Sequence, residues 1–153
     1  MSACCIIRIR GGIGVRKDVK DTMSMLRLTR VNHCVVVQNS PTVDGMLHKA
    51  KDYITWGKIS TETLAGLIEK RGRLSGDAPI TEEYLKGMGF DGFVSLAKAI
   101  EDGSIDYSEI EGVKPVFRLS PPKKGYEGRK RSVKEKGSLG QRESVDDLIN
   151  RMV

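Results

Sequence analysis

The sequence contains few of the residue types on which most catalytic and metal sites depend. Its 153 residues include two histidines, His33 and His48, and three cysteines. Neither histidine has a partner at the spacing of an HExxH helix or a CxxC knuckle, so the sequence predicts no metal site. It also has no G-x-S-x-G elbow and no convincing arrangement of nucleophile and base. We therefore expect a protein that is not an enzyme and uses no cofactor.

Long apolar runs and a regular cysteine pattern are missing as well. The longest apolar runs, CCIIRI and CVVV, are far shorter than the roughly 20 residues that span a bilayer. The N-terminus lacks the order of a signal peptide, because its arginines follow the short apolar run. An odd number of cysteines without regular spacing argues against a disulfide framework. We expect a cytosolic protein with buried, reduced thiols at Cys4, Cys5 and Cys34, and with Cys4 and Cys5 on opposite faces of a strand.

Charge, in contrast, is abundant and unevenly distributed. Residues 1–38 hold seven basic and two acidic side chains, a net charge of +5, and residues 112–142 have a net charge of +8. The intervening residues 39–111 have a net charge of −5. Either positive zone alone is compatible with a solvated face. Two such zones in one short chain favour a polyanion partner, because lysines and arginines that neutralise phosphates release condensed counterions.

The first sixty residues alternate between strand and helix patterns. The pattern predicts strands over residues 3–10, 32–39 and 53–59 and helices over residues 17–30 and 41–51. Ser40 and Pro41 are typical of an N-cap and the first helical position. The resulting β-α-β-α-β unit can pack two helices on one face of a small sheet. Such a small core is marginal alone, so we expect the rest of the chain partly to cover it.

The remainder of the chain predicts short helices around a basic stretch. Ser60, Thr81 and Asp91 are expected to cap three helices, and Ser144 to cap a terminal one. An extended segment is expected over residues 114–119. We therefore divide the chain into a core at 1–59, a helical extension at 60–111, and a basic arm with a terminal helix at 112–153.

Residues 120–140, SPPKKGYEGRKRSVKEKGSLG, contain two prolines, four glycines and seven lysines or arginines. Prolines and glycines disfavour helix and sheet, and ordering each residue costs roughly 1–2 kcal/mol. Little apolar burial is available here to offset that cost, whereas charge-assisted contacts to phosphates can do so. We expect a loop that is tied at both ends and clasps RNA; a disordered linker is the alternative.

Two further features could contact RNA. The GGIGVRK turn at residues 11–17 matches neither the dinucleotide fingerprint nor a P-loop. Its glycines permit close approach of a phosphate, to which Arg16 and Lys17 add charge; the alternative is a tight turn exposed to water. Tyr53 and Trp56 are three apart in an expected strand and should point to opposite faces. At least one should be in the core, and stacking on an RNA base is the alternative role.

A family resemblance is carried by residues 22–57, TMSMLRLTRVNHCVVVQNSPTVDGMLHKAKDYITWG. A Leu-rich helix, an Arg-x-Asn-His junction, a Val-rich strand, x-Pro-x-x-x-Gly-Met-Leu and Tyr-x-x-x-Gly resemble the L-thirty family of large-subunit ribosomal proteins. KRGRL, FRLSPPKKGYEGRKRSVKEKGSLG and LINRM extend the resemblance to its long archaeal form, related to eukaryotic L-seven. The resemblance implies an α+β fold: a β-α-β-α-β core with a small, largely antiparallel three-stranded sheet and two helices on one face, a helical extension and a basic C-terminal arm.

The same resemblance implies a structural, non-catalytic constituent of the large subunit of the cytoplasmic ribosome. The implied partners are large-subunit rRNA near the 5S rRNA region and neighbouring ribosomal proteins, with no membrane and no small-molecule substrate. The RNA-binding residues implied on the core are Arg10, Arg16, Lys17, Lys20, Arg27, Arg30, Asn32 and His33. Those on the arm, which rest mainly on charge, are Arg118, Lys123, Lys124, Arg129, Lys130, Arg131 and Lys134. A small α+β ligand-sensing regulatory domain is the alternative, and it predicts a ligand pocket.

Overall fold

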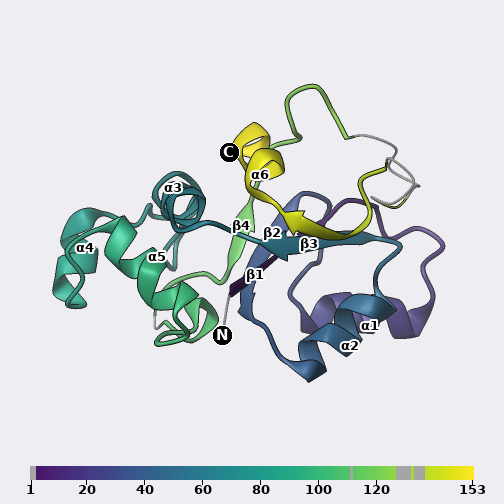
Figure 1. The fold of residues 1–153 in the computed structure, drawn as a ribbon, viewed down its shortest axis with the longest axis horizontal. Helices are drawn as coiled ribbons and strands as arrows, with labels where there is room; N and C mark the ends of the chain where they lie inside the picture. The colour runs from purple at the N-terminus through teal and green to yellow at the C-terminus, as the bar shows by residue number, and fades with distance from the viewer. Residues whose placement is uncertain (1–2, 111, 127–131, 133–136) are drawn as a thin grey trace.

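A computed structural model describes residues 3–110, 112–126, 132 and 137–153. These residues form a five-stranded sheet with helices on both faces (Figure 1). The strands are β1 (Ala3–Arg8), β2 (His33–Gln38), β3 (Ile54–Lys58), β4 (Val116–Arg118) and β5 (Gly140–Ser144). The helices are α1 (Lys17–Met25), α2 (Pro41–Lys49), α3 (Thr61–Arg71), α4 (Glu82–Gly87), α5 (Phe93–Glu101), α6 (Asp146–Met152) and the short 3-10 helix η1 (Tyr107–Glu109). The α+β class and the β-α-β-α-β order are confirmed.

The sheet has the spatial order β4-β2-β1-β3-β5. β1 pairs antiparallel with both β2 and β3, so the three expected strands form its centre. The extended segment near residue 116 is confirmed as β4, which pairs antiparallel with β2. The sheet is therefore larger than the three strands expected, because β4 and β5 are added at its two edges.

The fifth strand was not expected from the sequence. β5 runs parallel to β3, and Thr55 Oγ1 donates a hydrogen bond of 2.8 Å to the carbonyl oxygen of Gly140. Gly57 permits this pairing, since a Cβ atom at that position would lie 2.7 Å from the carbonyl oxygen of Arg142. Ser144 therefore ends a strand and does not cap α6; Val145 is the N-cap residue. The predicted cap at Ser144 is wrong, although its hydroxyl accepts a hydrogen bond from the Asp146 N–H.

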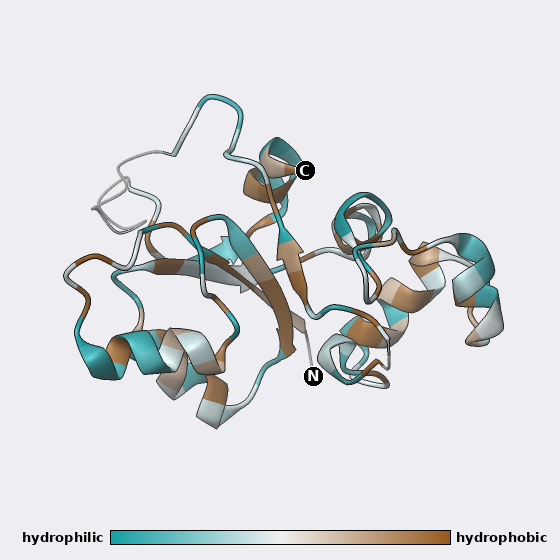
Figure 2. Cartoon of the chain, turned by 180° about the vertical axis from the view of Figure 1, so that it is seen from behind, coloured by the Kyte–Doolittle hydropathy of each residue, from teal (hydrophilic) through white to brown (hydrophobic). Residues whose placement is uncertain are grey.

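Each face of the sheet carries its own apolar cluster. On one face, Cys4 and Ile6 pack against Met23 of α1 and Leu47 of α2, which confirms that these two helices share a face. The other face is covered by α3, α5 and α6, and Cys5 belongs to that cluster. Cys4 and Cys5 thus lie on opposite faces, and all three cysteines are buried and free, as expected. Figure 2 shows the apolar residues on the strands and on the inner sides of the helices.

Helix α1 ends five residues earlier than predicted. Leu28 N–H donates to the carbonyl oxygen of Met23 and Arg27 N–H to that of Ser24, at 2.8 Å and 3.0 Å. This is a Schellman motif, with Arg27 at φ 63° in the position that glycine usually occupies. The motif brings Leu28, which is fully buried, back against Met23 in the core. Burial of Leu28 is the reason that the helix stops.

Three of the four other predicted helix starts are correct. The side chains of Ser40, Ser60 and Thr81 accept hydrogen bonds from the N–H three residues ahead. The predicted cap at Asp91 is wrong, because α5 starts one residue later with Gly92 as its N-cap. None of the helices in the described part of the chain is long and apolar enough to span a membrane.

The ends of the 120–140 stretch are packed on the protein itself. Ser120 N–H and Lys123 N–H donate to the carbonyl oxygens of Met152 and Arg151, at 3.1 Å and 3.0 Å. At the other end Ser138 and Leu139 are buried. The expectation that this stretch depends on contacts to phosphates for its order is therefore wrong for residues 120–126 and 137–140. The return of the chain to the folded body is confirmed, because Val145 and the apolar side of α6 are buried.

Candidate nucleic-acid interface

Two predicted site residues and one unpredicted arginine surround His33, which is itself a predicted site residue at the start of β2. His33 and Arg118 are register partners across β2 and β4. Burial lowers the pKa of His33 below its usual 6.5, and the positive charges of Arg118, Arg30 and Arg8 lower it further. The Nδ1 atom of His33 is buried and has no hydrogen-bond partner among the described residues. We call His33, Arg8, Arg30 and Arg118 the His33 cluster; it is a neutral imidazole held in a positive field that an approaching phosphate would relieve.

Arg8 holds the base of this region in place and was not predicted as a site residue. Only 5% of its surface is exposed. Its Nε donates to the carbonyl oxygen of Arg10 at 2.9 Å, and its Nη1 to that of Leu28 at 2.8 Å. Arg8 therefore ties the loop after β1 to the turn after α1, and its burial lowers its pKa. Strand alternation places Arg8 on the same face as Cys4 and Ile6, but only the packing of α1 and α2 shows that this face is covered.

The glycine-rich loop between β1 and α1 carries the next predicted residues. The guanidinium of Arg10 lies 5.0 Å from the centre of the Tyr53 ring, and its Nη1 donates to the Asp52 carbonyl oxygen at 3.2 Å. Arg16 is exposed and forms an ion pair of 3.1 Å with Asp18. Lys17 and Lys20 are exposed. Arg10 is held by two contacts with the fold, whereas Arg16, Lys17 and Lys20 are exposed and can adjust to a partner.

The prediction for the aromatic residues near this loop is partly wrong. Trp56 is buried, as expected for at least one of the two rings. Tyr53, however, precedes β3 and packs on the same apolar cluster as Trp56, so the two rings do not lie on opposite faces. With 6% of its surface exposed, Trp56 has no free ring face on which an RNA base could stack.

The turn after α1 presents Arg27 and Arg30, both exposed. Asn32, which follows, has φ 67° and is joined to the arm, since its Oδ1 accepts a hydrogen bond from the Tyr126 hydroxyl. Its backbone is also fixed, because its N–H donates to the Arg8 carbonyl oxygen at 2.8 Å. Asn32 is thus a link between core and arm, and its amide nitrogen can still donate to a partner.

The described arm residues lie close to the core. Arg118 Nη1 is 3.5 Å from Asp77 Oδ1, an exposed carboxylate whose pKa is lowered first by the Lys114 ammonium and then by Arg118. Lys123 and Lys124 are exposed. The remaining predicted residues, Arg129, Lys130, Arg131 and Lys134, lie outside the described residues.

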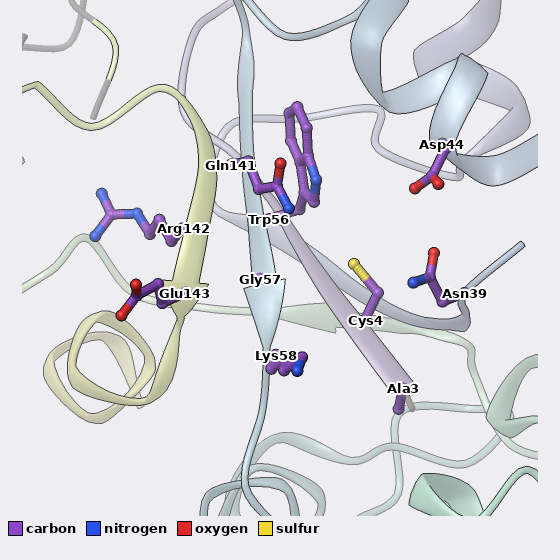
Figure 3. A pocket seen from close by; sticks show the side chains of 10 residues that line it. All are labelled: Ala3, Cys4, Asn39, Asp44, Trp56, Gly57, Lys58, Gln141, Arg142 and Glu143. Carbon is purple, nitrogen blue, oxygen red and sulfur yellow. The ribbon is translucent and has the colours of Figure 1, made fainter. Parts of the chain in front are cut away.

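A hollow of about 440 Å³ between α2, β1, β3 and β5 is relevant to the ligand-sensing alternative (Figure 3). Its floor includes Cys4 and Trp56, both largely buried. Arg142 points away from Cys4 in Figure 3 and is engaged elsewhere, with its Nε 2.8 Å from Thr55 Oγ1. A ligand pocket normally offers several convergent polar groups on an apolar wall. This hollow lacks a mainly apolar wall, because six of its ten lining residues are polar or charged.

The fold and the site define a class: a small α+β protein whose basic end is built from short loops braced by buried hydrogen bonds. The family model for ribosomal protein L30p/L7e matches residues 5–54. The large ribosomal subunit protein uL30 of Methanobrevibacter smithii is 48% identical over 150 residues, covering 97% of this chain and 98% of that protein. The uL30 proteins of Nanoarchaeum equitans and Thermoplasma volcanium are 46% and 47% identical over at least 97% of this chain. The chain belongs to the ribosomal protein L30p/L7e family, which confirms the resemblance.

Proposed function

We propose that this chain is a structural constituent of the large ribosomal subunit in the cytoplasm and binds rRNA through its basic end. The relatives that match it over nearly their whole length carry that subunit in their names. They belong to a structural family, so no catalytic step is expected. The single observation that supports the geometric part is the His33 cluster, where three separate parts of the sequence bring three arginines and one imidazole together.

The mechanism is electrostatic. Exposed lysines and arginines around the glycine-rich loop and the turn after α1 neutralise phosphates, while Arg8 keeps these two segments in register. Sequence-independent phosphate contacts supply affinity, and the shape of the RNA supplies specificity. The residues that we propose to face rRNA are those given above from the resemblance, with Asn32 donating through its amide nitrogen.

The arm has a proposed part of its own in this mechanism. Arg129, Lys130, Arg131 and Lys134 would add phosphate contacts next to the described, anchored residues 119–126. Replacing all four by glutamine keeps the length of the arm and removes four of the seven positive charges in residues 120–140. We expect the slope of log K against log salt to fall by about 0.7–0.9 for each phosphate that the arm no longer neutralises.

Two finer assignments are also proposals. The first is the three-part division at residues 59 and 111, although one apolar cluster contains residues from all three parts. The second is a position near the 5S rRNA region, with neighbouring ribosomal proteins as further partners. Crosslinking within purified large subunits tests the second: crosslinks to 5S rRNA or its immediate large-subunit rRNA neighbours support it, and crosslinks confined to distant rRNA contradict it.

The experiment for the function itself is a binding titration of the full chain with protein-free archaeal large-subunit rRNA. We expect affinity to fall steeply between about 50 and 200 mM salt, by a factor of roughly a thousand if six or more phosphates are contacted. The protein should also co-sediment with large subunits after a high-salt wash. A flat salt response together with absence from washed subunits would exclude the proposal. The ligand-sensing alternative has no specific observation in its favour.

A further inference from the structure

The most exposed large apolar side chain in the described part of the chain is Ile13, at the tip of the loop between β1 and α1. Its relative exposure is 101%, compared with 67% for Met25 and 50% for Val94. Cβ atoms placed at Gly11 and Gly14 would meet no other atom within 4 Å. Gly14 has φ 73°, a conformation that other residues rarely adopt. The loop therefore holds an isoleucine clear of the protein, where no contact within the fold stabilises it.

The base of the same loop is rigid. The N–H groups of Ile9 and Arg10 both donate to the Tyr53 carbonyl oxygen, at 2.9 Å and 3.2 Å. Arg8 holds the Arg10 carbonyl through a hydrogen bond from its Nε. A Cβ atom at Gly12 would lie 3.2 Å from Nη2 of Arg8, so the Arg8 side chain also packs close to Gly12. A tip on a fixed base loses less conformational entropy when it binds than a tip on a free chain. The position of Ile13 is thus largely set before any partner arrives.

The surroundings of the tip indicate the chemistry of that partner. Arg16 has 80% of its side chain exposed, and Lys17 beside it is exposed too. An apolar protein surface would have to bury these charges, whereas RNA offers phosphates for them and base faces for the isoleucine. Apolar side chains that enter between bases are a known device of nucleic-acid-binding proteins, and unstacked RNA bases present apolar faces.

We propose that Ile13 packs against an unstacked rRNA base, or between two bases, while Arg16 and Lys17 bind the adjacent phosphates. Ile13 is then a positioning contact that adds shape recognition to an otherwise electrostatic interface. This inference rests on the proposed function, because it requires that the basic end of the chain binds rRNA. It concerns a contact that carries no charge, and this makes it separable by experiment.

The test compares Ile13→Ala with wild type in titrations against protein-free archaeal large-subunit rRNA at several salt concentrations. Ile13→Ala should weaken binding by up to about fiftyfold, since three buried carbons are removed. The slope of log K against log salt should stay unchanged, because no charge is removed. Lys17→Gln should instead lower that slope by about 0.7–0.9. Ile13→Phe should keep or improve affinity, since aromatic rings stack on bases.

Val94→Ala on α5 is the matched control, because Val94 is also an exposed apolar residue but lies on the acidic extension. It should leave affinity and slope unchanged. Neither variant should alter thermal unfolding. If Ile13→Ala binds as tightly as wild type while the wild-type slope stays steep, the inference fails and the proposed function stands. If Ile13→Ala changes only the incorporation of a neighbouring protein into reconstituted subunits, Ile13 contacts protein and the inference is equally overturned. A flat wild-type slope, together with absence from washed subunits, would instead exclude the proposed function.

Discussion

The two ends of the molecule are packed alike but carry opposite charge. Residues 60–111 hold eleven acidic and five basic side chains, whereas residues 1–38 hold seven basic and two acidic ones. Each end buries an apolar cluster against its own face of the sheet. In Figure 1, α4 and α5 lie at the opposite end of the molecule from the loop that leads into α1. Since packing does not distinguish the two ends, charge must decide which one meets RNA.

The ends also differ in the backbone at one helix end, that of α1. In the acidic extension, α3 and α4 have side-chain caps at Ser60 and Thr81. In the basic end, α1 has no side-chain cap and stops at an arginine in a left-handed conformation. Side-chain caps do not separate the two ends, because α2 has one at Ser40 and α5 has none, so the difference lies in how α1 ends. The unusual backbone of the basic end is maintained by Leu28 and Arg8, so these two buried residues preserve the shape of its loops.

The largest expected effect concerns the strand that joins the two clusters. Phe117 in β4 is fully buried, and its ring stacks on that of Tyr107 at 4.9 Å. Phe117→Ala should lower the free energy of unfolding by about 3–5 kcal/mol, measured by urea denaturation. Tyr107→Phe is the matched control, because the Tyr107 hydroxyl is buried without a hydrogen-bond partner among the described residues. Tyr107→Phe should be as stable as wild type. If Phe117→Ala lost less than about 1 kcal/mol of unfolding free energy, the claim that β4 joins the two apolar clusters would be contradicted.

The next prediction distinguishes Arg8, which stabilises the loops of the basic end, from Lys20, which is exposed and proposed to contact rRNA. Arg8→Ala removes the donors to the carbonyl oxygens of Arg10 and Leu28, and should cost about 2–4 kcal/mol of stability. It should also weaken rRNA binding, although only 5% of Arg8 is exposed. Lys20→Ala, an exposed neighbour, should change stability by less than about 0.5 kcal/mol. Equal stability losses in the two variants would mean that Arg8 braces nothing.

A smaller effect is expected on the salt dependence of rRNA binding when one lysine is neutralised at either end of the molecule. Lys20→Gln on α1 and Lys86→Gln on α4 remove the same charge from exposed positions. Lys20→Gln should lower the salt slope of rRNA binding by about 0.7–0.9, and Lys86→Gln should leave it unchanged. Parallel titrations measure both. A larger change for Lys86→Gln would reverse the assignment of the two ends.

The smallest effect is on pH dependence. The pKa of His33 in the folded protein is below its usual 6.5, so the unfolded chain binds the proton more readily. The contribution of His33 to stability is therefore complete above pH 6.5 and is lost as the pH falls through the lower, folded-state pKa. His33→Gln should reduce the decline in unfolding free energy between pH 7 and 5, as followed by denaturation at each pH. If the unfolding free energy fell equally in both proteins, the pKa of His33 would be the same in the folded and unfolded chain, and the prediction would be wrong.

The sequence predicted what local patterns determine and missed what distant contacts determine. Ser40, Ser60 and Thr81 act within three residues of themselves, so their caps were predictable. β5 was not, because its pairing depends on contacts such as Thr55 with Gly140, 85 residues apart. The end of α1 depends on the burial of Leu28, which only the packed core reveals.

In the candidate site, too, the residues marked by local sequence patterns were predicted and the residue that depends on distant contacts was not. Clustered charge and the family resemblance indicated the exposed cations Arg16, Lys17 and Arg30. They did not indicate Arg8, because a charged residue in a strand is assigned a face only once the helices that cover that face are known. The sequence also overestimated how much of the arm depends on RNA for its order. Tyr126 bonds to Asn32 and Leu139 is buried, and both contacts are visible only in the folded protein.

The most direct test of the central claim uses directed hydroxyl-radical probing from single cysteines. The three native thiols are buried, and burial raises the pKa of Cys4 to about 12, so an introduced surface cysteine can be labelled selectively. The iron probe would be attached at Lys17→Cys on the basic end or Val94→Cys on the acidic extension, and each protein assembled into large subunits. We predict strong rRNA cleavage from position 17 and little from position 94. Equal or stronger cleavage from position 94 would contradict the claim that the basic end faces the RNA.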